Sequence, residues 1–324
     1  RTGTLVGAML PSHVDGDAVV AGLVDRRPVS LATPLVADAE IAPLTVAHWE
    51  GQRVLRASTA LVLLEAAACV LPEHIVRLGP SLGAAQRVVI DGGRPPPDLR
   101  EAARALAEEM HKITASDAPI REELWVLEEA IDHFTRVGWH DAVALLLGAR
   151  EATVPMVTCG TVYAPRMAPL APRTGMVEGF SLTVEDGALI LRHGLDGPME
   201  PASGVDARES APGAPASARD AMAREHERWL GSLGMDSVGA FNRACVTGRV
   251  PSIIRVAEGF HEKRIGRLAD EIAAGLPGTR LVCVAGPSSS GKTTFLKRLS
   301  VQLQVMGINP VGLSLDDYYV DRVR

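Results

Sequence analysis

One nine-residue segment near the end of the chain constrains the fold more than any other feature of the sequence. Residues 286–294 read GPSSSGKTT, which satisfies the pattern G-x-x-x-x-G-K-[ST] in full. A short apolar run, residues 280–285 (RLVCVA), comes directly before it, and residues 295–305 follow with leucines at helical spacing. The pattern predicts a strand, a tight loop and a helix in succession, which is typical of an α/β fold.

The residue types in this loop suit the binding of phosphate groups. Gly286 and Gly291 let the backbone curl so that successive N–H groups point inward, and the following helix adds its positive end. Lys292 can then reach the β- and γ-phosphates, and the Thr293 hydroxyl can ligate Mg²⁺. The alternative is a Gly- and Ser-rich turn that contains a lysine by chance. We expect Lys292 to be catalytic, Thr293 to hold the metal, and ATP to be bound by Gly286, Pro287, Ser288, Ser289, Ser290, Gly291, Lys292, Thr293 and Thr294.

A second apolar segment, residues 310–315, predicts another strand, and two acids, Asp316 and Asp317, follow it. In an open α/β sheet the carboxyl ends of neighbouring strands share one crevice. We therefore expect these acids beside the phosphate-binding loop, where a carboxylate can accept a proton from an attacking hydroxyl or order the water shell of a metal. An ordinary solvated acidic turn is the alternative.

Composition and charge narrow the class of protein. Hydrophobic residues make up 47% of the chain and charged residues 22%, so there is enough apolar material for a packed core. The net charge of −6 argues against a main task of neutralising a nucleic-acid backbone, although local basic patches remain open. The four cysteines form no CxxC pair, and buried free thiols are the expectation. The longest apolar stretch, residues 61–71, is too short to span a bilayer, which predicts a cytoplasmic protein without membrane partners.

Changes in composition divide the chain into five predicted regions. Residues 1–48 alternate short apolar runs with turns and predict a β-rich module; residues 49–195 alternate helical and β-rich patterns, including helices over 56–71, 99–113, 121–135 and 139–147. Residues 196–220, rich in Pro, Ala, Gly and Ser, predict a flexible linker, and residues 221–275 predict a helical connector. Residues 276–324 contain the phosphate-binding loop and predict the truncated start of a further domain. Because the chain starts at arginine and stops after a predicted strand, we expect it to be a fragment.

Two resemblances follow from these motifs. The run GPSSSGKTTFLKRLSVQL with the later SLDDYYVDR resembles the start of the uridine kinase and phosphoribulokinase family of P-loop kinases. More specifically, the chain is similar to bacterial members with a threonyl-tRNA synthetase-like half, in which residues 1–48 resemble part of a TGS module and RVLRASTALVLL resembles the second-domain helix. The implied fold is an α+β N-terminal region followed by the first β-loop-α-β unit of an α/β P-loop kinase domain.

The resemblance also implies an activity. It points to ATP-dependent phosphoryl transfer to a nucleoside 5′-hydroxyl, with ATP and Mg²⁺ as cofactors and a nucleoside as the substrate. It makes Asp316 the general base, ranks Asp317 below it, and places Tyr319 against the nucleoside. Residues 276–324 are too few for a complete kinase domain, so the fragment alone is not expected to be active.

The synthetase-like half departs from its relatives at four positions. In threonyl-tRNA synthetases this domain edits mischarged tRNA with an HxxxH pair and a later C-x3-H pair, and the matching residues here are Ala57, Leu61, Arg166 and Leu170. None of these is such a ligand, so metal-dependent editing is not expected. The open alternative to the kinase is a non-catalytic RNA- or nucleotide-sensing module built on the synthetase-like domain, although nucleic acid is not the expected partner.

Overall fold

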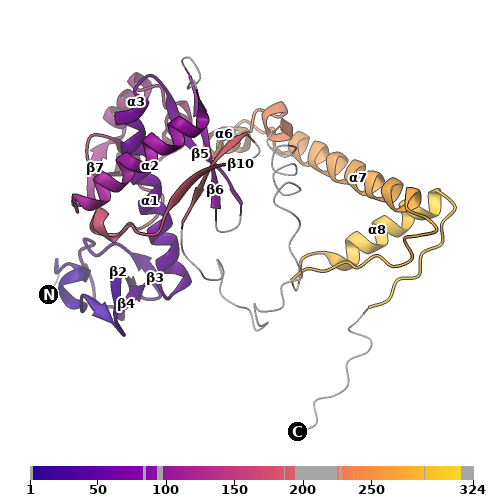
Figure 1. The fold of residues 1–324 in the computed structure, drawn as a ribbon, viewed down its shortest axis with the longest axis horizontal. Helices are drawn as coiled ribbons and strands as arrows, with labels where there is room; N and C mark the ends of the chain where they lie inside the picture. The colour runs from indigo at the N-terminus through magenta and orange to yellow at the C-terminus, as the bar shows by residue number, and fades with distance from the viewer. Residues whose placement is uncertain are drawn as a thin grey trace, which may run out of the picture. The chain divides into compact units, whose positions relative to one another are not determined.

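The computed structural model describes residues 3–82, 85–92, 98–185, 187–193, 225, 228–235, 237–287 and 289–314. The chain forms two compact units, residues 1–243 and residues 244–324. The first unit combines helices with antiparallel sheets, and Figure 1 shows its elements in chain order from indigo through magenta toward orange. The mixed helix-and-sheet architecture expected for the N-terminal region is therefore present, and each unit is described below by itself.

The first unit starts with a small antiparallel sheet built on a long central strand. Strand β2 pairs with the other three strands and runs antiparallel to each of them. Its two hairpin turns use left-handed backbone at Asp15, Gly16, Asp25 and Arg26, which suits the Asp-Gly turn in particular. The elements are the 3-10 helix η1 (Val6–Met9) and strands β1 (His13–Val14), β2 (Asp17–Val24), β3 (Arg27–Val29) and β4 (Ile41–Thr45).

Helix α1 (Trp49–Val70) is the long helix that contacts both the N-terminal sheet and the main core, and it begins seven residues before the predicted start at residue 56. The His48 side chain caps it by accepting a hydrogen bond from the Glu50 N–H. Gly51 allows close approach to β4, because a Cβ there would lie 1.9 Å from the Thr45 carbonyl oxygen. Its first turns pack on the N-terminal sheet through Val54 and Leu55, and its later turns enter the main core.

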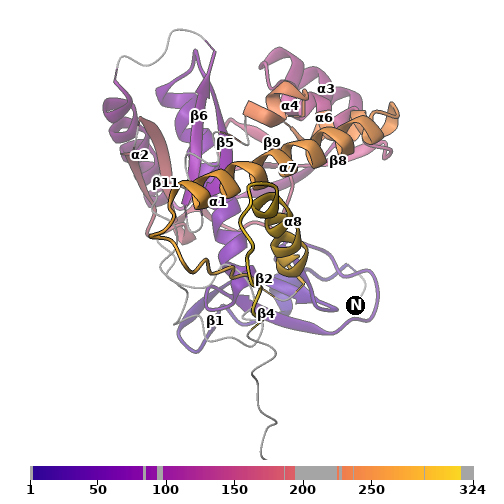
Figure 2. The same cartoon turned by 90° about the vertical axis from the view of Figure 1, so that its right-hand side faces the viewer.

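The main core lies between α1, helix α2 and a four-stranded sheet in the order β10-β11-β6-β5 (Figures 1 and 2). Its fully buried members include Leu63 of α1, Leu106 and Met110 of α2, and Leu191 of β11. Asp98 caps α2 by accepting a hydrogen bond from the Arg100 N–H. The elements are β5 (Ile75–Leu82), β6 (Ala85–Asp91), α2 (Leu99–Ala115), β10 (Ser181–Glu185) and β11 (Ala188–Arg192).

A second lobe of the unit packs two helices on a three-stranded sheet in the order β7-β8-β9. Phe134 and Met156, both fully buried, fill its core. The elements are β7 (Arg121–Val126), α3 (Leu127–Arg136), α4 (His140–Leu146), β8 (Thr153–Thr158) and β9 (Tyr163–Pro165), with the 3-10 helix η2 (Thr174–Met176) after them. The helix predicted over 121–135 is wrong in its first part, because residues 121–126 pair with β8 as a strand, and only the later residues form α3.

The second unit is a helical hairpin in its described part. Helix α6 (Val238–Val246) leads into it; α7 (Val250–Ala274) then packs against α8 (Lys292–Val305) through Ile265, Ala269, Leu299 and Leu303. The strands predicted over 280–285 and 310–315 are absent from the described residues 280–287 and 308–314. Leu281 is 77% exposed and Val311 is 84% exposed. A strand of a parallel sheet needs neighbours to pair with and helices on its faces, and the described part of this unit contains no such neighbour. The β-loop-α-β unit is therefore not formed there.

Candidate functional site

The phosphate-binding loop keeps the local geometry that its glycines predict. Gly291 has a left-handed backbone at φ +84° and directly precedes α8, so the helix starts at Lys292. The Lys292 Nζ donates hydrogen bonds to the carbonyl oxygens of Gly286 and Pro287, at 2.8 and 2.7 Å. A Cβ on Gly286 would lie 2.8 Å from the Ser290 hydroxyl oxygen, so a glycine fits this bend. The loop thus curls around its lysine.

Several predicted site residues fall outside this description. Ser288 of the loop, the predicted base Asp316, its neighbour Asp317 and the predicted nucleoside contact Tyr319 lie outside the described residues. The described loop residues Gly286, Pro287, Ser289, Ser290, Lys292, Thr293 and Thr294 are close in sequence around the start of α8. The structure therefore describes a curled loop at a helix start, and the roles of its residues stay predictions.

The structure brings together three of the four positions that match editing ligands in the synthetase resemblance. Leu61 and Leu170 are buried in one apolar cluster with Val157 and Cys159, and Ala57 packs against it. The fourth position, Arg166, forms an ion pair with Glu122 at 3.3 Å. Among the described residues no group of three His, Cys, Asp or Glu side chains is placed to hold a metal ion. At the positions where synthetases of the resembled family have metal ligands, this chain has an apolar contact between α1 and the segment after β9.

A buried carboxylate beside this cluster was missed by sequence reasoning. The Glu65 side chain accepts hydrogen bonds from the N–H groups of Thr161 and Val162, at 2.8 and 2.7 Å, and from the Thr161 hydroxyl at 3.0 Å. These contacts hold the β8–β9 turn against α1. Burial, followed by the charge of Glu65, raises the pKa of the Cys159 thiol to about 12. Cys159 is therefore a packed thiol and a poor nucleophile at neutral pH.

A cleft continues from the apolar cluster along α1. Leu64 follows Ala57 and Leu61 at helical spacing, so all three lie on one face of the helix. The cleft consists of two adjoining cavities of about 330 and 530 Å³, which share Leu64, Ile75, Val76, Gly138 and Trp139. It lies between the main core's edge strand β5 and the turn that joins α3 to α4.

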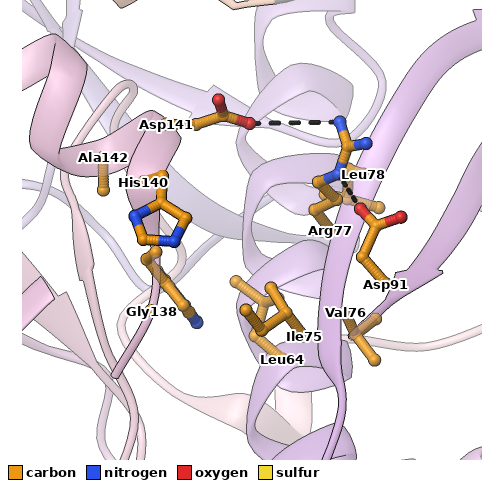
Figure 3. A pocket seen from close by; sticks show the side chains of 11 residues that line it. Leu64, Ile75, Val76, Arg77, Leu78, Asp91, Gly138, His140, Asp141 and Ala142 are labelled. Atoms are coloured by element: carbon orange, nitrogen blue, oxygen red, sulfur yellow. Dashed lines mark hydrogen bonds and ion pairs between the residues drawn. The ribbon is translucent and has the colours of Figure 1, made fainter. Parts of the chain in front are cut away.

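The first cavity has a charged rim over an apolar floor (Figure 3). Arg77 of β5 forms an ion pair with Asp91 of β6 and lies 3.9 Å, Nη1 to carboxylate oxygen, from Asp141 of α4. In Figure 3 Arg77 lies between the two acids, while Leu64 and Ile75 line the apolar side. The rim thus joins the main sheet to the second lobe by charge.

The second cavity is walled by rings. His133, Trp139 and Tyr163 line it, and Trp125 lies behind them with its ring centroid 4.7 Å from Tyr163 and 5.3 Å from His133. Burial, followed by the charge of Arg136, lowers the pKa of His133, which favours the neutral ring. These residues carry no motif, so no sequence signal marked them.

No family model matches this chain. Its similarity to curated proteins covers about half of its length. It is 30% identical over 174 residues to the threonine–tRNA ligases of Methylococcus capsulatus and Aromatoleum aromaticum, and 30% identical over 175 residues to that of an Azoarcus species. About half of the chain is threonyl-tRNA synthetase-like. Each match covers 53% of this chain and 27% of the ligase, so the similarity spans about a quarter of the length of the relatives.

These matches correct the predicted activity. The expectation of a nucleoside kinase, and with it the assignment to transferases of the uridine kinase and phosphoribulokinase type, is wrong, because the curated relatives are threonine–tRNA ligases. The comparisons give no support to a P-loop kinase domain or to a nucleoside substrate. The expectation of a synthetase-like half is confirmed. In the described part of the chain, none of the helices is long and apolar enough to cross a membrane.

Proposed function

We propose that the synthetase-like part of this chain binds tRNA and that the cleft beside α1 receives part of the RNA. The similarity to threonine–tRNA ligases is the observation that carries this proposal. The cleft supports it, because it offers a hollow of suitable chemistry on the same face of α1 as Ala57 and Leu61. The proposal concerns binding and does not include a chemical step.

The residues of the second cavity suit an unpaired nucleotide. The faces of Trp139 and Tyr163 are of the kind on which bases stack, and Arg136 lies at the same cavity with an exposed side chain. The side chains of Ala57, Leu61 and Leu170 have no lone pairs that could hold a metal, and the raised pKa of Cys159 keeps its thiol protonated. Recognition without hydrolysis therefore fits this arrangement best.

Binding of a labelled tRNA to the full chain, measured by fluorescence anisotropy, tests the proposal. We expect binding by a threonine-accepting tRNA transcript and a small dependence on salt, since few cations line the cleft. Trp139→Leu keeps an apolar side chain but removes the stacking face, and should weaken binding by about 10-fold or more.

Two variants that each remove one positive charge provide a test and its matched control. Arg136→Gln should weaken binding about threefold to tenfold, whereas Arg104→Gln, at an exposed position of α2 outside the cleft lining, should leave it unchanged. Absence of tRNA binding at low salt would refute the proposed function. Binding that neither cleft variant weakens would move the RNA away from this cleft.

We propose further that residues 286–294 bind the phosphates of a nucleotide. The specific observation that favours this is the curled loop, in which the Lys292 ammonium is already directed to the loop carbonyls and Gly291 supplies the left-handed turn before α8. Lys292 would hold phosphate oxygens and Thr293 would contribute a hydroxyl to Mg²⁺, which neutralises phosphate charge when bound. Asp316 and Tyr319, outside the described residues, stay predictions for the same site.

Equilibrium binding of ATP with Mg²⁺ tests this second proposal. Lys292→Ala should weaken the affinity at least about 10-fold, since a charge-assisted contact to phosphate is lost. Lys297→Ala, at an exposed position of α8, is the control and should bind ATP as the parent does. Equal affinities of Lys292→Ala and the parent would show that the loop is only a turn.

A further inference from the structure

Three side chains carry buried polar atoms without a partner: Gln52 and Arg56 near the start of α1, and His193 directly after β11. The atoms are the Gln52 Oε1, the Nε and Nη2 atoms of Arg56, and the His193 Nδ1. Gln52 and Arg56 are four residues apart on α1, so their side chains neighbour each other on one face. The Arg56 charge acts on His193, which places the ring close to the guanidinium.

Arg56 presents a free hydrogen-bonding edge. The Nε and Nη2 atoms belong to the same side of the planar guanidinium, and this side is the one that binds two oxygens of a carboxylate or phosphate at once. Both atoms are shielded from solvent and lack an acceptor. Burial lowers the pKa of Arg56, with no acid acting against it among the described residues.

The nearby acids of α1 are engaged elsewhere. Glu50 pairs with Arg53 at 3.3 Å, and Glu65 accepts the hydrogen bonds of the β8–β9 turn. An unpaired buried charge is costly, and each unsatisfied buried donor or acceptor costs about 1–3 kcal/mol. A partner for the free edge of Arg56 is therefore missing from the described residues.

His193 extends the group from the sheet side. Leu189, Leu191 and His193 alternate along β11 and its end, so that the ring follows two core residues on the same face. His193 is 4% exposed. Burial and then the charge of Arg56 lower the pKa of His193 to about 4, so the ring is neutral near pH 7.

We propose that Arg56, His193 and Gln52 form a binding site for a phosphate group. The free edge of Arg56 donates to two phosphate oxygens, and the His193 Nδ1–H donates to a third. Rotating the Gln52 amide exchanges its oxygen and nitrogen, which turns an NH₂ donor toward the anion. We infer phosphate rather than a carboxylate because the two donors of the Arg56 edge and the His193 ring call for three oxygens, and a carboxylate has two. The site is distinct from the cleft and from residues 286–294.

Titration of the full chain with inorganic phosphate in a chloride buffer tests the proposal. NMR signals of the Arg56 Nε–Hε group and of the His193 ring should shift saturably, and the melting temperature should rise. The bound anion offsets the charge of Arg56, so the pKa of His193 should rise from about 4. Acetate at equal concentration should bind at least about tenfold more weakly.

Variants separate a built site from general anion effects. Arg56→Lys keeps the charge but loses the two-donor edge and should weaken phosphate binding at least about tenfold. Arg53→Gln, three residues away with a side chain that is 57% exposed, is the control and should bind phosphate as the parent does. His193→Gln gives a second test in case Arg56 variants fail to fold, and it should also weaken binding about tenfold.

The proposal is overturned by any of three results. The first is the absence of a saturable shift at Arg56 and His193. The second is a shift that Arg56→Lys and His193→Gln leave unchanged, and the third is binding of acetate as tight as that of phosphate. The first would mean that an acid of the chain already fills the edge. Loss of tRNA binding would leave these measurements unaffected, so the failure of the proposed function and of this inference can be told apart.

Discussion

The buried Glu65 contact gives the sharpest prediction. Glu65→Gln replaces one of two carboxylate oxygens with an NH₂ group, which cannot accept from the N–H groups of Thr161 or Val162. The Thr161 N–H now reaches both oxygens, at 2.8 and 2.9 Å, so it loses one of its two acceptors whichever oxygen is replaced, and the hydrogen bonds that remain lose their charged acceptor. A lost hydrogen bond to a charged group is worth about 1.5–3 kcal/mol, and the remaining bonds to a neutral amide are weaker than those to a carboxylate, so the turn should be destabilised by about 3 kcal/mol.

Amide hydrogen exchange at Thr161 and Val162 measures this change directly. A destabilisation of about 3 kcal/mol corresponds to exchange roughly 100-fold faster at both amides, by the relation of about 1.4 kcal/mol per factor of ten. Glu109→Gln is the matched control, because Glu109 pairs with Lys112 at 2.8 Å on the exposed side of α2, and it should change exchange at the turn less than twofold. Exchange within threefold of the parent in Glu65→Gln would refute the reasoning that this carboxylate fastens the β8–β9 turn.

Three further predictions concern reactivity, pH and packing. The pKa of Cys159 is about 12 and that of a free thiol is about 9, so iodoacetamide at pH 8 should alkylate Cys159 at least about 100-fold more slowly than an exposed thiol such as Cys245. Mass spectrometry follows both reactions, and comparable rates would contradict this prediction. The pKa of His193 is about 4 in the fold against 6.5 ordinarily, so between these pH values the unfolded chain binds a proton that the folded chain does not. The free energy of unfolding should therefore fall by up to about 3 kcal/mol as the pH drops from about 6.5 to about 4, as measured by urea unfolding in phosphate-free buffer. His193→Gln should flatten that slope, and an unchanged slope would show that His193 does not cause it. Phe134→Ala, at a fully buried ring of the second lobe, should cost about 3–5 kcal/mol, and a loss under about 1 kcal/mol would contradict the core assignment.

Local sequence signals determined those parts of the fold that depend on few neighbours. The helix predicted at 99–113 corresponds to α2, which Asp98 caps. Gly291 takes the left-handed turn that the loop pattern requires, and the helix after it forms as α8. Caps, turns and amphipathic spacing act within one or two turns of chain, so the amino-acid order alone carries them.

Strands were less well predicted because pairing partners decide them. Residues 121–126 carry a helix-like spacing but pair with β8, whereas the apolar residues 280–285 stay extended and exposed without a partner among the described residues. An apolar β-branched run therefore predicts a strand only where the tertiary structure supplies a neighbour.

The resemblance to synthetases correctly predicted what about half of the chain is similar to, and the resemblance of the phosphate-binding loop to kinases misled the assignment of activity. No sequence signal showed that Ala57, Leu61 and Leu170 would close into one apolar contact, that Glu65 would reach across to Thr161, or that Arg56 would lie beside His193. Glu65 and Thr161 are 96 residues apart, and Arg56 and His193 lie on elements that only the packed core brings together. Such contacts depend on the relative placement of helix and sheet, which is set by the burial of the whole apolar core and carries no local pattern.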